Sequence, residues 1–371
     1  MFIFLSSYFL LNSSEAQATA QIPSSHGTLS VDVLRSDLHH PWGMTFLSAD
    51  ELLITERRGR LWRLNLKTGT KKEVNGLPVI QAKGQGGLLD VELSPNFGKD
   101  RRVYLSYTGG TPKRKSTHVG YGVLKGTKLK NFRVLFEASP KIASGYHFGS
   151  RLVFDSKGFL FITLGDRGSM DMAQDPSNHA GAVVRLEQDG SIPKSNPFIG
   201  NSRYQPEIFS FGHRNVQGAT LNPWTDDVWT HEHGPRGGDE LNLIRPKHNY
   251  GWPKVTFGID YDGSTISTRT TGPGFTAPLH HWTPSIAPSG MTFVYGPEFP
   301  LWQGDLLIGS LKFRQLRHLK MKGTKVLSEE ILLKEFDERI RDVEIGPAGI
   351  VYILTDHKNG KLIRISRARK R

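Results

Sequence analysis

One segment, residues 231–253, concentrates residue types that suit cation binding; it reads HEHGPRGGDELNLIRPKHNYGWP. Its glycines permit positive φ and close approach of the backbone, and Pro235 fixes φ and removes a donor. A backbone bent in this way can point carbonyl oxygens inward, as a hard cation such as Ca²⁺ requires. Asp239, Glu240 and Tyr250 add side-chain oxygens nearby. On spacing alone, a structural loop with hydrogen-bonded acidic side chains is an equally good interpretation.

A second candidate for chemistry is His147, in the motif GYHFGSRLVFD. A lone histidine is more often a structural or surface residue. Here it comes just before a predicted strand, a position that favours a general base. Asp166, in LGDRG after the next predicted strand, could orient the imidazole and stabilise its protonated form. The chain has no G-x-S-x-G motif, so a serine nucleophile is not indicated.

Four cations occupy similar positions beside predicted strands: Arg214, Lys312, Arg339 and Arg341. If these side chains converge, they form an anion site, and arginine suits planar carboxylates through paired hydrogen bonds. The simpler interpretation is separate ion pairs with Glu338, Asp342 and Glu344, and it is the better one for any single cation. Cations that face a loop of carbonyl oxygens, with a histidine nearby, favour a polycarboxylate ligand that also chelates calcium.

The elements that must position these residues follow a repeated pattern. A short apolar strand, a turn with Pro, Asp or Gly, and a strongly β-prone strand recur six times, with a mean spacing of roughly 60 residues. The copies lie at residues 42–64, 88–107, 151–186, 219–243, 291–319 and 342–365.

The repeats predict an all-β protein, a six-bladed β-propeller with four-stranded blades. Residues 29–34 should pair into the last blade and close the ring. A β-sandwich is the alternative, but regular repeats along the whole chain argue against it. Long loops at residues 108–120, 169–180 and 265–277 are expected to crowd one face around the axis, and no linker divides the chain.

Composition limits the partners. The 371 residues carry 48 Lys and Arg against 35 Asp and Glu, a formal charge of +13, and no cysteine, so thiol chemistry is excluded. Basic residues are scattered apart from residues 113–115 and 367–371, which we expect to be solvated, and nucleic acid is therefore not predicted. Residues 1–20 read as a secretory signal peptide with an A-x-A-like site, followed by the propeller domain over residues 21–371. We expect no membrane insertion and a periplasmic or secreted protein.

These segments resemble the soluble quinoprotein sugar dehydrogenases, that is, the aldose sugar dehydrogenases that depend on pyrroloquinoline quinone (PQQ), also called glucose/sorbosone dehydrogenases. The likeness runs from HPWGMTFL at His40 to LTDHKNGKLIRI. It includes GQGGLLDV, HFGSRLVFD, GHRNVQG, EHGPRGGDELN, NYGWP and RIRDV, in the order typical of the family. The ordered set is specific, and the family's fold is a six-bladed propeller.

The resemblance implies a role for each matching residue. His147 would be the base, supported by Asp166, and Arg214 would offset charge on the quinone oxygen. Contacts with PQQ would come from Gln85, His147, Arg214, Asn215, Lys312, Arg339 and Arg341. The carbonyls of Gly234 and Pro235 would hold the Ca²⁺ that PQQ chelates, and Glu240, Tyr250 and Asp260 match a second, structural Ca²⁺ site.

The function implied is oxidation of the anomeric hydroxyl of aldoses to lactones, with PQQ as hydride acceptor and Ca²⁺ as Lewis acid. Electrons would pass to a separate acceptor, and the protein would be a monomer or homodimer. An open site walled by loops predicts a broad aldose preference. The alternatives are a non-catalytic propeller that binds sugar or protein, and a Ca²⁺-dependent lactonase, which would need several acidic or Asn ligands around one axial metal.

Overall fold

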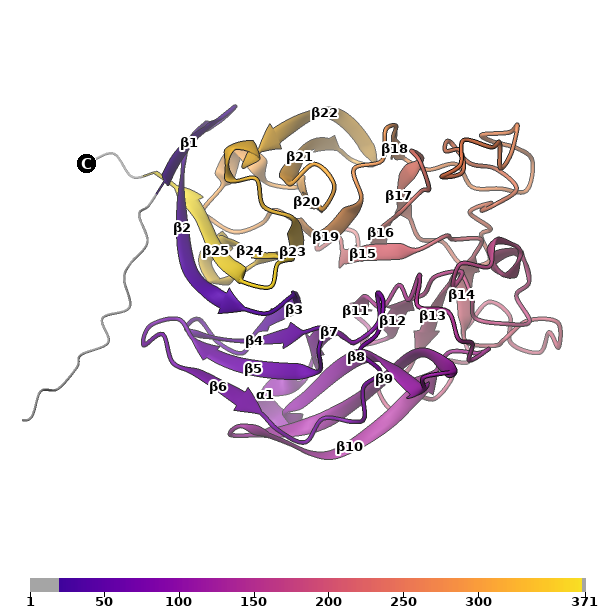
Figure 1. Ribbon diagram of the computed structural model, residues 1–371, viewed down its shortest axis with the longest axis horizontal. Coiled ribbons are helices and arrows are strands. Elements are labelled where there is room, and N and C mark those ends of the chain that lie inside the picture. Colours follow the sequence, from indigo (N-terminus) through magenta and orange to yellow (C-terminus); the bar gives the residue numbers. More distant parts are fainter. Residues whose placement is uncertain (1–19, 369–371) are drawn as a thin grey trace, which may run out of the picture.

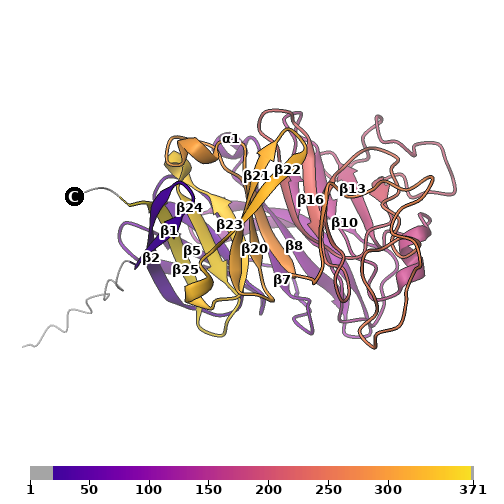
Figure 2. The ribbon, with the colours of Figure 1, turned by 90° about the horizontal axis from the view of Figure 1, so that it is seen from above.

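The computed structural model describes residues 20–368, which form six antiparallel sheets arranged around a central axis (Figure 1). The sheets stand side by side like blades, as the view at right angles shows (Figure 2). The prediction of an all-β, six-bladed propeller is confirmed, and each sheet coincides with one of the six sequence repeats.

The first strand of each blade lies nearest the axis, and the later strands follow outward. Blade 1 contains β3 (Pro41–Phe46), β4 (Glu51–Glu56), β5 (Arg60–Asn65) and β6 (Lys71–Val74). Blade 2 contains β7 (Leu88–Leu93), β8 (Arg102–Thr111), β9 (Arg114–Lys125) and β10 (Lys128–Glu137). Blade 3 contains β11 (Leu152–Phe154), β12 (Leu160–Thr163), β13 (Ala182–Leu186) and β14 (Ile208–Phe211). Blade 4 contains β15 (Val216–Leu221), β16 (Val228–Glu232), β17 (Asp239–Leu243) and β18 (His280–Trp282). Blade 5 contains β19 (Pro288–Phe293), β20 (Leu306–Ser310), β21 (Gln315–Lys322) and β22 (Lys325–Leu332). Blade 6 contains β23 (Ile340–Ile345), β24 (Val351–Thr355) and β25 (Gly360–Arg367).

Burial explains which residues the strands use. The second strands, such as β4 (ELLITE) and β24 (VYILT), are buried on both faces because neighbouring blades cover them, so they read as continuous apolar runs. The outermost strands β10 and β22 are mostly exposed and rich in Lys and Glu, which keeps these free edges soluble.

The N-terminal strand closes the ring, as predicted. Strand β2 (Gly27–Leu38) pairs antiparallel with β25, and β1 (Ala20–Ser24) adds a fifth strand outside it. Residues 1–19 of the predicted signal peptide lie outside the described residues. In the described chain, no helix is both long enough and apolar enough to cross a bilayer.

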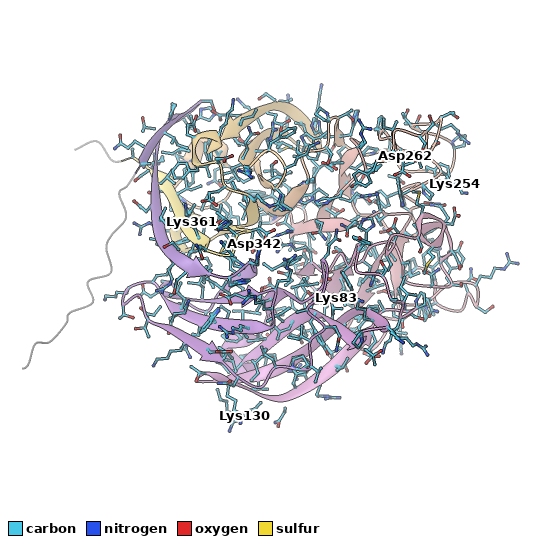
Figure 3. The ribbon with its side chains drawn as sticks, viewed as in Figure 1. Lys83, Lys130, Lys254, Asp262, Asp342 and Lys361 are labelled. Atoms are coloured by element: carbon cyan, nitrogen blue, oxygen red, sulfur yellow. The ribbon has the colours of Figure 1, made fainter. Side chains whose placement is uncertain are left out.

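A buried ion cluster joins the blades near the axis, where Asp342 lies in Figure 3. Arg151 Nη1 lies 2.7 Å from Asp342 Oδ1 and 3.2 Å from Asp90 Oδ1, and its Nε donates to the Gln217 carbonyl at 2.9 Å. The four residues belong to blades 3, 6, 2 and 4. A buried charge is tolerated only when it is paired, so this cluster favours one arrangement of the blades.

Two expectations about the segment 108–120 are wrong. It was predicted to be a loop, but β8 and β9 continue through it as a hairpin that turns at Pro112-Lys113. The Gly, Pro and Lys residues indicated a loop, yet the strands pair up to Thr111 and Arg114 because each covers the other. Lys115, expected to be solvated, is only 2% exposed. Short helical turns complete the fold: α1 (Phe97–Asp100), η1 (Met170–Gln174), η2 (Pro300–Trp302), η3 (Lys334–Phe336) and η4 (Pro347–Gly349).

Candidate active site

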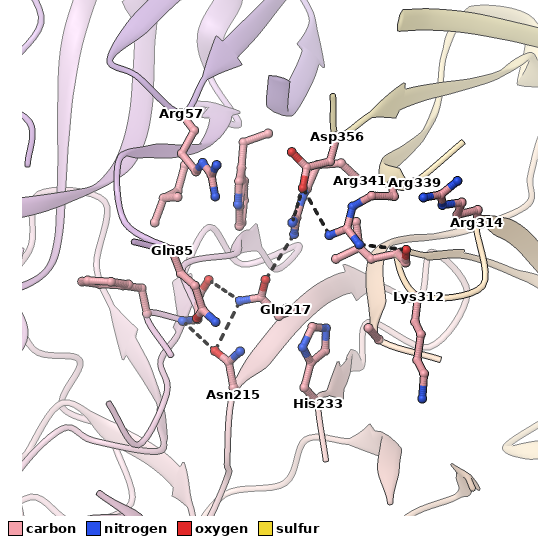
Figure 4. Close-up of a pocket in the computed structure, with 16 residues that line it drawn as sticks. Arg57, Gln85, Asn215, Gln217, His233, Lys312, Arg314, Arg339, Arg341 and Asp356 are labelled. Carbon is pink, nitrogen blue, oxygen red and sulfur yellow. Dashed lines mark hydrogen bonds and ion pairs between the residues drawn. The ribbon is translucent and has the colours of Figure 1, made fainter. Parts of the chain in front are cut away.

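A cavity of about 380 Å³ lies where all six blades meet, a volume typical of small-molecule sites. Its cations are Lys312, Arg314, Arg339 and Arg341 on one side and Arg57 on the other, with Gln217 between them (Figure 4). The remaining lining residues are Trp42, Gln85, Leu89, Phe148, Gly149, Asn215, His233, Ala287, Leu311 and Asp356. Five of the seven residues predicted to contact PQQ therefore share one cavity: Gln85, Asn215, Lys312, Arg339 and Arg341.

The charges of the cavity are strongly unequal, with five cations and one carboxylate. Arg339 and Arg341 flank Ile340, the first residue of β23, and both side chains line the cavity because the strand pairing is irregular at Arg341. Their Nη2 atoms lie 3.5 and 3.3 Å from Asp356 Oδ2. Burial would raise the pKa of Asp356, but the charge of Arg341 and the hydrogen bond to His40 hold it far below its usual range. Asp356 is thus ionised, and it compensates only part of the positive charge.

The simpler interpretation of separate ion pairs named the wrong partners. Glu338 pairs with Lys361 at 2.6 Å, and Asp342 pairs with Arg151. In the described part of the chain, Lys312 forms no ion pair with a carboxylate. Three of the four predicted cations, Lys312, Arg339 and Arg341, therefore converge on the cavity, and Arg214 is not among its lining residues.

His147 adjoins the cavity through Gln85, whose side-chain Oε1 accepts the His147 backbone N–H at 2.8 Å. The imidazole Nδ1 lies 2.6 Å from Asp166 Oδ1, and the His147 side chain is 14% exposed. The backbone of His147 is left-handed, with φ of 50°, which is uncommon for a residue other than glycine. This conformation directs the side chain toward Asp166 rather than along the strand that follows.

The environment of Asp166 fixes the proton on the imidazole. Burial raises the pKa of Asp166, but the hydrogen bond and charge of His147 and the N–H of Gly168 lower it further, so the net shift is downward. An ionised Asp166 can only accept, so Nδ1 carries the proton. The unprotonated Nε2 has no hydrogen-bond partner among residues 20–368 and can receive a proton.

Trp252 connects this pair to Arg214. The indole Nε1–H donates to Asp166 Oδ2 at 2.8 Å, and the Arg214 guanidinium lies 5.3 Å from the indole ring. Arg214 Nη1 donates to the carbonyls of His233 and Gly234 at 3.0 and 2.9 Å. The three residues predicted to be catalytic, His147, Asp166 and Arg214, therefore belong to one connected group.

One of the two carbonyl oxygens predicted to bind the cofactor calcium already accepts a hydrogen bond. The Gly234 carbonyl accepts from Arg214, while no partner is described for the Pro235 carbonyl. Gly234 lies against Gly237 and Gly238, and an added Cβ would meet the Gly237 carbonyl at 2.1 Å. The segment bends tightly, as its glycines and proline predicted, but the guanidinium would have to leave before a cation could use the Gly234 oxygen.

The second predicted calcium set is not gathered in the same way. Glu240 is partly buried beside Glu232, and desolvation together with the Glu232 charge raises its pKa well above the usual range. The Tyr250 hydroxyl donates to the Leu243 carbonyl and accepts the Arg245 N–H. Asp260 lies in a turn that its own backbone closes with Ser264, and no contact joins it to Glu240 or Tyr250. Within the described residues, no group of three His, Asp or Glu side chains could hold a metal.

Besides Arg314, which lies two residues after Lys312, four polar residues of the site were given no role by the sequence, and three of these four share a position. Arg57, His233 and Asp356 each directly follow the second strand of a blade. The predicted residues Asp166 and Lys312 lie within three residues of the end of the second strand of their own blades. Searching the end of the second strand in every repeat would therefore have found Arg57, His233 and Asp356. The fourth, Gln217, lies inside β15, where the sequence carries no comparable signal.

Three comparisons relate this chain to known proteins. Residues 38–364 match the family described as Glucose / Sorbosone dehydrogenase. Over 345 residues the chain is 44% identical to aldose sugar dehydrogenase YliI of Escherichia coli strain K12, covering 91% of this chain and 93% of that protein. The apo-form crystal structure of the soluble aldose sugar dehydrogenase from Escherichia coli is 43% identical with a TM-score of 0.89, covering 92% of this chain and 100% of that one. The PQQ-bound aldose sugar dehydrogenase of Streptomyces coelicolor is 28% identical with a TM-score of 0.76, covering 91% and 98%.

The fold and the site define an oxidoreductase built on a six-bladed propeller, with a cationic cavity on its axis. More particularly, the chain belongs to the glucose/sorbosone dehydrogenase family, and it is a sugar oxidoreductase of that family.

Proposed function

We propose that this protein oxidises the anomeric hydroxyl of aldoses to lactones, with PQQ as the hydride acceptor and Ca²⁺ beside it. The observation that carries the proposal is the combination of a cationic axial cavity with the adjoining His147–Asp166 pair. A module that only binds sugar would need neither a paired histidine with a free Nε2 nor five cations around a single carboxylate.

The cavity suits PQQ by its charge and its walls. PQQ is a planar tricarboxylate, and Lys312, Arg339 and Arg341 could bind its carboxylates. Trp42 and Phe148 supply aromatic surface, and Gln85 and Asn215 supply neutral donors. When bound, PQQ supplies a quinone that can accept a hydride.

His147 takes the hydroxyl proton of the sugar in this proposal. Its Nε2 is the free acceptor, and Asp166 stabilises the imidazolium that forms while holding the ring in one orientation. Arg214, held by two carbonyls and lying over Trp252, places a positive charge where a negative charge would develop.

Calcium is the second cofactor of the proposal. The carbonyls of Gly234 and Pro235 would hold the ion after Arg214 gives up its bond to Gly234. The partly buried carboxylate of Glu240, next to Glu232, is a reason to expect a second cation nearby, with Tyr250 and Asp260 as the other predicted ligands. A cation would compensate repulsion between those two carboxylates.

The surroundings of His147 and Arg214 suit sugar rings. Tyr146, next to His147, is 62% exposed, and Tyr261, 6.0 Å from the Arg214 guanidinium, is 67% exposed. A tyrosine offers an apolar ring face on which a sugar ring could stack and a hydroxyl that can form hydrogen bonds. Two tyrosines on open loops offer stacking without a closed pocket, so we propose a broad range of aldoses.

The proposal extends to the cellular context. The apolar residues 1–11 and the A-x-A-like sequence at residues 18–20 support export to the periplasm or beyond, with residues 21–371 as the mature domain. A separate acceptor would remove the electrons, and the protein would act as a monomer or homodimer.

Reconstitution tests the proposed function. Purified apoprotein is titrated with PQQ, with and without Ca²⁺, and dye reduction is followed with D-glucose, D-xylose and maltose. We expect activity only when both PQQ and Ca²⁺ are present. Activity that survives exhaustive EDTA treatment contradicts the role of calcium, and PQQ binding without sugar oxidation supports the binding module instead.

A further inference from the structure

The segment that carries His147 has neither helix nor strand, yet other elements bind its backbone at every step. Residues 143–147 lie between β10 and β11. Four consecutive carbonyls, those of Ala143, Ser144, Gly145 and Tyr146, accept hydrogen bonds from outside the segment. Lys115 Nζ donates to the Ala143 carbonyl at 2.9 Å, and the Gln85 backbone N–H donates to the Gly145 carbonyl at 2.9 Å. Arg167 donates through Nη2 to the Ser144 carbonyl at 2.6 Å and through Nε to the Tyr146 carbonyl at 3.0 Å.

Arg167 contributes two of these four bonds. It is 6% exposed, and its guanidinium carbon lies 3.7 Å from the centre of the Phe148 ring. It therefore binds the backbone just before His147 and covers the side chain just after it. Arg167 also directly follows Asp166, the residue that holds the imidazole. The contacts form a closed ring from His147 through Asp166 and Arg167 to the Tyr146 carbonyl and back to His147.

Lys115 acts on the same segment from another blade. Its Nζ donates to the carbonyls of Ala143 and Pro112, and its backbone exchanges two hydrogen bonds with Ile142 at 3.1 and 3.2 Å. The β8–β9 hairpin thus extends beneath residues 142–144, which explains why this strand continues where the sequence predicted a loop.

Burying Arg167 and Lys115 costs desolvation free energy that an uncharged side chain in the same place would not. Neither forms an ion pair with a carboxylate in the part of the chain that the structure describes, and Arg167 Nη1 has no hydrogen-bond partner there. Burial lowers the pKa of Arg167 to about 10, and burial and the charge of Arg167 lower the pKa of Lys115. Buried charges on neutral carbonyls are unfavourable, and such arrangements persist where they hold a functional conformation.

We propose that Arg167 and Lys115 are positioning residues that hold the backbone of His147 in its left-handed conformation and so aim Nε2 at the substrate. This inference rests on the proposed role of His147 as the base. Neither cation lines the cofactor cavity, and both reach the site through residues 143–147, while Arg167 also packs on Phe148, which does line it.

The test compares Arg167→Met and Arg167→Lys with Arg185→Met as a matched control. Arg185 is in the same blade, lies 4.7 Å from the Phe159 ring and donates to Asn196 at 2.8 Å, but it does not contact residues 143–147. We expect Arg167→Met to lower kcat for D-glucose by about 10- to 100-fold through misplacement of the base. KM and PQQ uptake should stay within about threefold of the wild type, and Arg167→Lys, with one cationic donor, should recover part of kcat. Arg185→Met should leave kcat unchanged.

A second readout uses the apoprotein and needs no activity. Amide hydrogen exchange of Tyr146 and His147, whose N–H groups donate to Ser144 Oγ and Gln85 Oε1, should become faster by on the order of tenfold in Arg167→Met and in Lys115→Met, because each change removes anchors of this backbone. Arg185→Met should not change it. The proposal is overturned if Arg167→Met keeps kcat within twofold, if exchange of the segment is unchanged, or if Arg185→Met has the same effects.

The proposed function and the positioning role of the two cations can be refuted separately. A wild-type protein that does not oxidise sugars with PQQ and Ca²⁺ refutes the proposed function, and the exchange measurement still decides whether the two cations fix the segment. A wild-type enzyme whose His147→Ala variant is inactive while Arg167→Met is fully active refutes only the positioning role.

Discussion

Replacing Asp166 by Asn changes one atom and removes the negative charge that fixes the His147 tautomer. Both carboxylate oxygens are in use: Oδ1 faces His147 Nδ1 at 2.6 Å and the Gly168 N–H at 2.7 Å, and Oδ2 accepts from Trp252 at 2.8 Å. An asparagine offers one acceptor and one NH₂ donor at these positions.

Neither orientation of the asparagine satisfies the site. With its oxygen toward Trp252, its NH₂ faces Nδ1, so His147 must carry its proton on Nε2 and cannot accept another. With its oxygen toward His147, its NH₂ opposes the indole N–H, leaving a buried donor unpaired at a cost of about 1–3 kcal/mol. We therefore expect kcat of Asp166→Asn to fall by roughly 10²–10⁴-fold, the usual contribution of a positioned base.

The assay is steady-state dye reduction by reconstituted enzyme, with PQQ affinity measured in parallel to confirm that the cavity is intact. Trp252→Phe provides a sharper test, because it removes the indole N–H that disfavours the productive orientation. The double variant Asp166→Asn/Trp252→Phe should be faster than Asp166→Asn alone, although slower than Trp252→Phe. Near wild-type kcat in Asp166→Asn, or a double variant no faster than the single one, would refute this reasoning.

Three further predictions concern other parts of the molecule. Arg151→Met should destabilise the fold by roughly 3–5 kcal/mol in urea unfolding, because it leaves two buried carboxylates unpaired; an unchanged midpoint would contradict this. Burial and the nearby Asp90 raise the pKa of Glu92 to about 8, so the folded state holds its proton to higher pH than the unfolded state, and stability should fall as pH rises from about 4.5 to about 8. Glu92→Gln should flatten that slope, and equal slopes would contradict the assignment. Tyr261→Ala should raise KM for D-glucose by about 2- to 10-fold with kcat nearly unchanged. The control is Trp224→Ala, which removes an exposed aromatic side chain from the turn between β15 and β16 and should change neither KM nor kcat.

The sequence predicted the fold because each blade repeats the same pattern of apolar strand, turn and β-prone strand. Strands buried on both faces, such as β4 and β24, give continuous apolar runs that stand out from the turns. The exception was the hairpin through residues 108–120, where pairing between strands and contact with residues 142–144 outweigh a composition typical of loops.

The convergence of the cations was predicted from their positions beside the strands, whereas their partners were not. Asp356 pairs with Arg339 and Arg341 although Glu338 and Asp342 are closer in sequence, because β24 places Asp356 beside the start of β23. Local spacing cannot show which residues of neighbouring strands form pairs. The hydrogen bond between Arg214 and Gly234 likewise depends on how blades 3 and 4 meet.

The most direct test of the central claim is a single-turnover measurement on His147→Ala. The variant is loaded with PQQ and Ca²⁺, mixed with D-glucose without dye, and the absorbance change of the bound cofactor is followed in a stopped-flow instrument. We predict that the variant still binds PQQ and that its bound cofactor is reduced by the sugar roughly 10²–10⁴-fold more slowly. Reduction at the wild-type rate would show that His147 does not take the proton, and the proposed mechanism would be wrong.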